Sequence, residues 1–133
     1  MNRTTKFRGK DIKTGKWRCG DLIENQGRFF IYHASSETTI KDNDDNSITV
    51  VAIEVDPETV GEFTGLLDKN GEEIYEEDLL NNEFGGIWAV RFNKDGFWEC
   101  YDDPNGGYFL SDYLKSSAII SNIHDNPELL NTK

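Results

Sequence analysis

Short runs in which apolar and polar residues alternate, separated by turns rich in glycine and asparagine, are the main pattern of this chain. A two-residue alternation places successive side chains on opposite faces of a β-strand. It is clearest at 47–55, where every second residue from Thr49 to Val55 shares one face. Residues 28–33 are dense in aromatic and β-branched side chains, and 117–123 alternate again. The pattern predicts a mainly β protein.

Three turns that contain glycine predict hairpins. Residues 13–16 and 93–96 each separate two short apolar runs. In 68–71, the Asn70-Gly71 pair favours a type I′ turn, since both residues tolerate positive φ. The turn at 13–16 is expected to join strands at 7–8 and 17–18. The turn at 93–96 is expected to join strands at 87–92 and 97–101.

Helical structure is expected only as one or two short turns. Asp56 and Asn126 each precede a proline, so each is placed to cap a brief helical turn whose first residue is that proline. Residues 108–114 fit either one helical turn or a strand. Residues 72–78 have Ile74 and Tyr75 as their only apolar pair and lead into Leu79 and Leu80.

The elements divide into two small β lobes, with a boundary between 56 and 62. The N-terminal lobe, 1–60, carries the first hairpin and the strand at 47–55. The C-terminal lobe, 61–133, carries the later turns and the last strand, and we expect it to close into a small barrel.

The charge balance narrows the function. The chain has 133 residues, with 14 Lys and Arg against 25 Asp and Glu, for a net charge of −11. This excludes a generally basic nucleic-acid binder, and no apolar run is long enough to span a membrane. Yet 7 of the 14 basic residues lie in the first 18 positions. The candidate basic contact segment consists of Lys6, Arg8, Lys10, Lys13, Lys16 and Arg18. It is read either as a contact for phosphate or an acidic partner, or as a solvated strand face.

The N-terminal residues and the spacing of the cysteines predict a cytoplasmic protein. The first ten residues are polar and basic, without the apolar stretch of a secretion signal. Cys19 and Cys100 lie far apart and form no CxxC pair, so both are expected as reduced thiols.

No catalytic or metal-binding pattern is complete. Asp42, Asp44 and Asn46 match the start of a calcium loop, but its required glycine and its final glutamate are missing. The run of acids in 72–78 is more typical of a solvated face than of a catalytic pair. Neither cysteine can be assigned to His33 or His124, and phosphate-binding glycine motifs are absent. We therefore expect no enzyme activity and no cofactor.

The aromatic residues exceed what a simple alternating core needs. Neighbours such as Phe29 and Phe30, or Phe97 and Trp98, point to opposite faces of a strand. One of each pair belongs in the core, and the other covers a lobe or subunit interface or binds a partner. The candidate partner-binding aromatics are Phe97, Trp98 and Tyr101.

Four sequence motifs, in this order, resemble the YopX-like proteins of phages and prophages. They are Lys6-Phe7-Arg8-Gly9-Lys10-Asp11, the stretch 55–66 (VDPETVGEFTGL), the stretch 68–78 (DKNGEEIYEED) and 123–130 (IHDNPELL). The resemblance covers both ends and the centre of the chain. Glu77 stands where that family usually has glycine. If that glycine takes a positive φ, Glu77 is strained or the turn differs.

The resemblance implies a small, mainly β protein with an N-terminal β lobe, a C-terminal SH3-like barrel and no established activity. We expect a non-enzymatic phage or prophage accessory protein in the bacterial cytoplasm that binds a host or phage protein. The alternatives are a small nucleic-acid-binding barrel that uses the basic segment, and an acidic inhibitor that imitates DNA. No membrane contact is expected. The sequence is compatible with either a monomer or a homo-oligomer.

Overall fold

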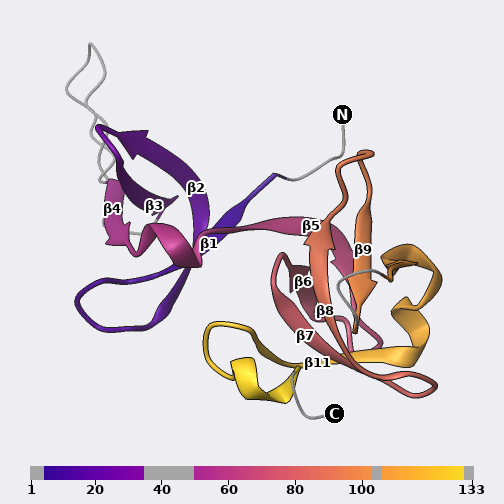
Figure 1. Cartoon of the computed structure of the whole chain (residues 1–133). Helices are drawn as coiled ribbons and strands as arrows, with labels where there is room; N and C mark the ends of the chain where they lie inside the picture. Colours follow the sequence, from indigo (N-terminus) through magenta and orange to yellow (C-terminus); the bar gives the residue numbers. More distant parts are fainter. Residues whose placement is uncertain (1–4, 35–49, 103–105, 131–133) are drawn as a thin grey trace. The chain divides into compact units, whose positions relative to one another are not determined.

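The computed structural model describes residues 5–34, 50–102 and 106–130, and the chain divides into two compact units (Figure 1). The N-terminal unit is Thr5–Glu62, and the C-terminal unit begins at Phe63. The strands are β1 Phe7–Lys10, β2 Trp17–Asn25, β3 Arg28–Ala34, β4 Val50–Val55, β5 Gly61–Leu67, β6 Glu73–Tyr75, β7 Asp78–Asn82, β8 Gly86–Phe92, β9 Trp98–Tyr101, β10 Tyr108–Phe109 and β11 Ser117–Asn122. The 3₁₀ helices are η1 Pro57–Thr59, η2 Leu110–Asp112, η3 Leu114–Ser116 and η4 Pro127–Leu129.

The N-terminal unit is an antiparallel meander in the order β4-β3-β2-β1, continued by the start of β5. The predicted basic hairpin is confirmed as β1 and β2, and Gly15 has a φ of +73° in its turn. The end of β4 returns to the first hairpin through a bridge between Asp11 and Val55. Val55 is buried against Gly9, where a Cβ atom would lie 2.7 Å from a methyl carbon of Val55. A side chain at position 9 would therefore force this packing apart.

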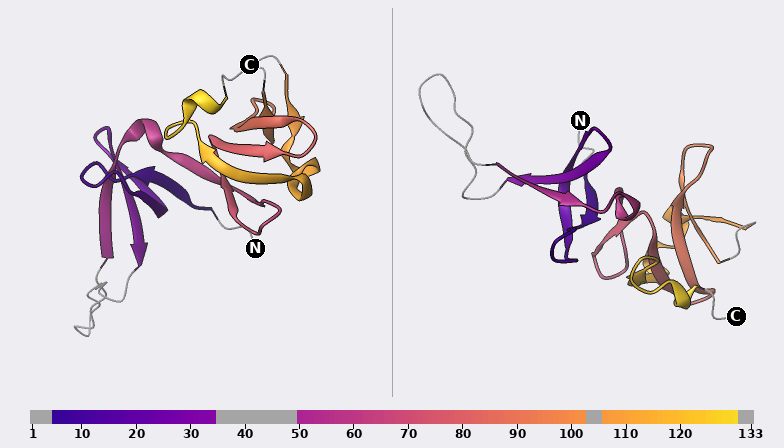
Figure 2. Two further views of the ribbon diagram at one scale, coloured as in Figure 1. Left: turned by 90° about the horizontal axis from the view of Figure 1, so that it is seen from below. Right: turned by 60° about the vertical axis from the view of Figure 1, so that its left-hand side comes forward.

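The C-terminal unit contains a five-stranded antiparallel sheet in the order β10-β9-β8-β7-β11, together with the β5–β6 hairpin. Figure 2 shows how β11 leads into the turn that ends in η4. The buried core of this unit comprises Ile74, Leu80, Trp88, Val90, Cys100 and Leu110. Trp88 and Val90 share a face of β8, as their spacing predicts.

The mainly β prediction is confirmed, with two antiparallel sheets and short 3₁₀ turns as the helical content of the described residues. The described strands form no closed barrel, because β10 and β11 stand at the two ends of an open order. In the part of the chain that the structure describes, no helix is long and apolar enough to cross a membrane.

The turn at 68–71 differs from the predicted type I′ geometry. Gly71 has a φ of +80°, whereas Asn70 has no positive φ. The Gly71 N–H donates to the Asp68 carbonyl at 3.0 Å, and the Asp68 N–H donates to the Glu72 carbonyl at 2.9 Å. One left-handed glycine after a tight turn is typical of a longer hairpin loop with a bulge. The type I′ prediction required a positive φ at both Asn70 and Gly71, whereas this turn has a positive φ only at Gly71.

Two further local predictions have mixed outcomes. Asp56 caps η1, because its Oδ1 accepts the Glu58 N–H at 3.1 Å. Asn126 precedes η4 but does not cap it; its Nδ2 donates instead to Glu128 Oε1 at 3.0 Å. The segment around Ile74 forms β6, the strand that follows the hairpin turn at 68–71, and Ile74 is fully buried.

Candidate functional site

An open pocket of about 250 Å³ lies on the C-terminal unit where β9, β10 and η2 meet. We call it the aromatic pocket, because four of its lining side chains carry rings. Its lining residues are Phe97, Glu99, Gly107, Tyr108, Phe109, Asp112 and Tyr113. They come from β9 and the residue before it, from β10 and the residue before it, and from the turn that follows β10.

The aromatic rings of this pocket pack on one another but stay open to solvent. The centroids of Phe97 and Phe109 are 4.7 Å apart. Tyr108 stacks on buried Trp88 at 4.9 Å and meets Tyr113 edge-on at 5.7 Å. Tyr108 and Phe109 nevertheless remain 43% and 55% exposed. The ring contacts hold exposed apolar surface in place.

A buried carboxylate lies beside these rings. Glu99 is 5% exposed, and its oxygens accept from Arg91 Nε at 2.6 Å and Asn93 Nδ2 at 2.8 Å. Burial acts to raise the pKa of Glu99, but the hydrogen bonds from Arg91 and Asn93 hold that pKa below its ordinary value. Glu99 is therefore anionic at neutral pH. A Cβ atom on Gly107 would lie 2.6 Å from Glu99 Oε1, so glycine leaves the space that the carboxylate occupies.

The three predicted partner-binding aromatics separate in the structure. Phe97 lines the aromatic pocket. Trp98 points to the other side of the strand, where it packs against the core and meets Phe92 edge-on at 5.0 Å. Tyr101 lies beneath the Arg91 guanidinium, with 4.0 Å between the guanidinium carbon and the ring centroid. The pocket instead brings Phe97 together with Tyr108, Phe109 and Tyr113. The sequence did not identify Tyr108 and Phe109, because β10 has only two residues and shows too little alternation.

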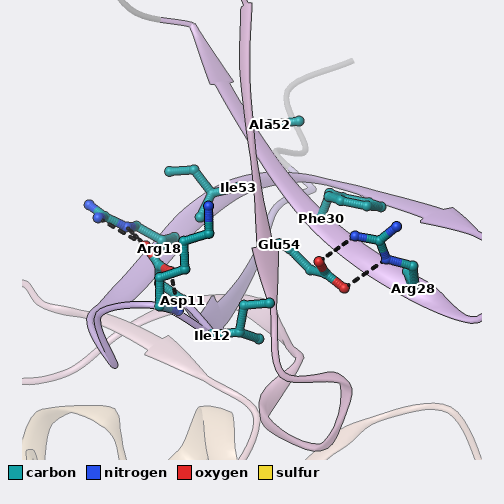
Figure 3. Close-up of a pocket in the computed structure, with 9 residues that line it drawn as sticks. Asp11, Ile12, Arg18, Arg28, Phe30, Ala52, Ile53 and Glu54 are labelled. Atoms are coloured by element: carbon teal, nitrogen blue, oxygen red, sulfur yellow. Dashed lines mark hydrogen bonds and ion pairs between the residues drawn. The ribbon is translucent and has the colours of Figure 1, made fainter.

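A second pocket, of about 460 Å³, lies on the N-terminal unit and contains two ion pairs, with Phe30 beside the Arg28–Glu54 pair (Figure 3). Arg18 approaches Asp11 Oδ2 with Nη2 at 3.2 Å. Arg28 holds Glu54 with two hydrogen bonds, at 2.9 Å and 2.6 Å. Each guanidinium in this pocket is matched by a carboxylate.

The two carboxylates of this second pocket are held in their charged form. The backbone N–H of Lys13 is the main cause that lowers the pKa of Asp11, and Arg18 adds to it against the opposing effect of burial. The hydrogen bond from Arg28 lowers the pKa of Glu54. Glu54 in turn raises the pKa of Arg28. Neither carboxylate has the raised pKa of a general acid, so this pocket shows the chemistry of a structural ion-pair cluster.

Three side chains of the candidate basic contact segment contact other residues of the same hairpin. Arg8 and Lys10 lie over the Trp17 ring, with 4.6 Å and 5.5 Å to its centroid. Arg18 is paired with Asp11. Lys13 and Lys16 are exposed around the turn, and Lys6 is half-buried just before β1.

The nucleophile candidates that the structure describes have different surroundings. Cys19 is an exposed thiol, and Cys100 is a buried one, whose burial raises its pKa to about 12. His124 is in contact with Glu77 through Nε2 and Oε2. The side chain of His33 and the candidate calcium loop at 42–46 lie outside the described residues. Among the residues that the structure describes, no group of three or more His, Cys, Asp or Glu side chains is arranged to hold a metal ion.

Comparison with known proteins decides the family. The model of the YopX protein family matches residues 6–131, which is nearly the whole chain. The chain belongs to the YopX protein family. A solved structure with a similar fold is the crystal structure of protein EF1440 from Enterococcus faecalis, at 23% identity and a TM-score of 0.53. The similarity covers 96% of this YopX-family chain and 98% of that one. No curated protein matches the chain.

Proposed function

We propose that this YopX-family chain is a non-enzymatic accessory protein that binds another protein through the aromatic pocket. The observation that carries the proposal is the exposure of Tyr108 and Phe109 beside Phe97 on one sheet edge. Aromatic side chains that are held rigid and left exposed are typical of the centres of protein interfaces.

The position of β10 supports this proposal. Among the described residues, β10 has one strand neighbour, β9, so it lies at the edge of its sheet. An edge strand presents backbone groups that can pair with an extended segment of a partner. Side chains of such a segment would fall on the aromatic pocket beside it.

The chemistry of the pocket fits binding better than catalysis. Glu99 is engaged by two donors and is held ionised, so it does not have the free, raised-pKa carboxyl group of a general acid. The Cys100 thiol, with its pKa of about 12, stays protonated at neutral pH and is a poor nucleophile.

The wider setting belongs to the same proposal. We place the protein in the cytoplasm of a bacterial host of a phage or prophage, on the resemblance carried by the four motifs. The SH3-like topology of the C-terminal unit is supported by the contact of the β5–β6 turn with β11, where the Lys69 N–H donates to the Ser117 carbonyl at 3.0 Å.

The decisive experiment compares capture from a nuclease-treated bacterial lysate by the wild-type chain and by a Phe97→Ala, Phe109→Ala double variant. We expect the double variant to capture at least about tenfold less of a protein that the wild type retains. A loss of this size is usual when interface hot spots are substituted. The control is Ile23→Ala, which removes an exposed apolar side chain of the N-terminal unit. Urea unfolding checks that the double variant is folded. Equal capture by the folded double variant would refute the proposed binding site.

Nucleic-acid binding is the second candidate, and one arrangement favours it. The basic hairpin places the half-buried side chains of Arg8 and Lys10 over the ring of Trp17, and cations beside an aromatic ring suit a single strand. Binding of a labelled single strand should then fall steeply with salt. No binding at low salt would remove this candidate. An acidic DNA mimic is a weaker proposal, because Asp11, Glu54 and Glu99 are committed to internal ion pairs.

A further inference from the structure

We propose that the aromatic pocket binds one cationic side chain, an arginine or a lysine, of an extended segment in the partner protein. This inference rests on the proposed function and names the chemistry of its partner. It follows from three features of the pocket: its rings, its charge and its size.

The rings supply the faces that cations prefer. A guanidinium or ammonium group is attracted to an aromatic face when it lies within about 6 Å of the centroid. Phe97, Tyr108 and Phe109 converge on the pocket from β10 and from the residue before β9. The protein already uses this contact nearby, where Arg91 lies 4.0 Å from the Tyr101 centroid.

The charge of the pocket selects a cation over a neutral apolar group. Two acidic side chains line it, Glu99 and Asp112, and no basic side chain does. Arg91 balances Glu99 at 2.6 Å. Asp112 is exposed in η2, and no ion pair joins it to another described residue. The surrounding field has the same sign, since residues 63–133 contain 14 acidic and 5 basic side chains. Such a field attracts a basic segment and raises its association rate.

The size and the position of the pocket favour a side chain rather than a free ligand. Its volume of about 250 Å³ falls below the roughly 300–1,000 Å³ of typical small-molecule sites. It adjoins the edge strand β10, where the backbone of an extended segment can lie. A long, flexible cationic side chain can then reach from that backbone onto the rings.

The test titrates the ¹⁵N-labelled full chain with acetyl-Gly-Ser-Arg-Ser-Gly-amide and with the same peptide carrying citrulline. Citrulline keeps the shape of arginine and removes its charge. We expect the arginine peptide to shift the amide signals of Gly107, Phe109 and Asp112 in a saturable way. The citrulline peptide should bind about two- to fivefold more weakly, which corresponds to one exposed cation–aromatic contact. A lysine peptide should resemble the arginine peptide.

Two charge-matched variants localise the effect. Asp112→Asn should weaken arginine-peptide binding about threefold, which matches the modest value of an exposed charge contact. Glu72→Gln removes an exposed carboxylate of the same unit outside the pocket, and should change binding little. Equal binding of the citrulline peptide would overturn the inference. So would the absence of saturable shifts in the pocket, or equal weakening by both variants.

The outcome is separable from that of the proposed function. If protein capture depends on Phe97 and Phe109 but the arginine peptide does not bind, the interaction site stands and the cation pocket is wrong. If the arginine peptide binds as expected but capture is unaffected by the double variant, the pocket recognises cations and the proposed interaction site fails.

Discussion

The carboxylate of Asp68 accepts a hydrogen bond from the backbone N–H of Ile119, 51 residues further along the chain, at 2.9 Å. Its other oxygen accepts the N–H groups of Asn70 and Glu72, each at 2.9 Å. One buried side chain therefore shapes the turn after β5 and ties it to β11. This relationship gives a physical reason for an aspartate at the start of the Asp-Lys-Asn-Gly motif.

Asp68→Asn is expected to destabilise the protein by about 1–3 kcal/mol, because the new amide group replaces one acceptor oxygen with a donor that faces backbone N–H groups. Urea unfolding followed by tryptophan fluorescence measures the change. Asp95→Asn, in the exposed turn before β9, is the matched control and should change stability little. A loss no larger than that of the control would show that the three hydrogen bonds contribute little.

Glu77 occupies a left-handed backbone position, with a φ of +72°, where the family usually has glycine. Glycine adopts this conformation without the steric cost of a side chain. We therefore expect Glu77→Gly to be more stable than Glu77→Ala by about 1 kcal/mol. Both variants lose the contact with His124, so their difference isolates the backbone. Equal unfolding free energies in urea would contradict a strain at this residue.

Acid should weaken the C-terminal unit through Glu99. A carboxyl group whose pKa is lowered in the folded state stabilises the protein above its ordinary pKa, 4.5 for Glu99, and this stabilisation is lost as the pH falls through the folded pKa. The urea concentration at the unfolding midpoint should thus fall as the pH is lowered below about 4.5. In Glu99→Gln this part of the acid dependence should be absent. An unchanged slope in that variant would assign the acid loss to other carboxylates.

The two thiols should react at very different rates. Cys19 is exposed, whereas Cys100 is fully buried and its pKa is raised to about 12. At about pH 8, a disulfide reagent should modify one thiol of the native protein and two in denaturant. Cys19→Ser should abolish the native reaction. Rapid modification of that variant without denaturant would mean that the core around Cys100 opens easily.

The sequence was most informative where a local backbone requirement marks an element. Gly15 and Gly96 lie at the expected turns with φ of +73° and +97°, and Asp56 caps the expected short helix. By contrast, β6 has only three residues. Its place depends on pairing with β5, including the contact between Phe63 and Tyr75, which no local pattern reveals.

The candidate site was predictable only in part for the same reason. Phe97 could be found, because adjacent aromatics on a strand must face opposite ways. Tyr108 and Phe109 become neighbours of Cys100 and Glu99 through the register of β9 and β10. Tyr101 lies under Arg91 because of the register between β8 and β9. Such cross-strand neighbours are set by long-range pairing and not by the local order of residues.

The boundary between the two compact units falls inside β5, whose residues Gly61 and Glu62 pair with β1 while Phe63 and Leu67 pair with β6. A gene fragment cut at that boundary would give each half an incomplete ladder. Recombination between related genes at this boundary would therefore divide β5. A viable exchange of either unit would have to include all residues of β5. We expect exchanges within this family to preserve residues 61–67 as one inherited block.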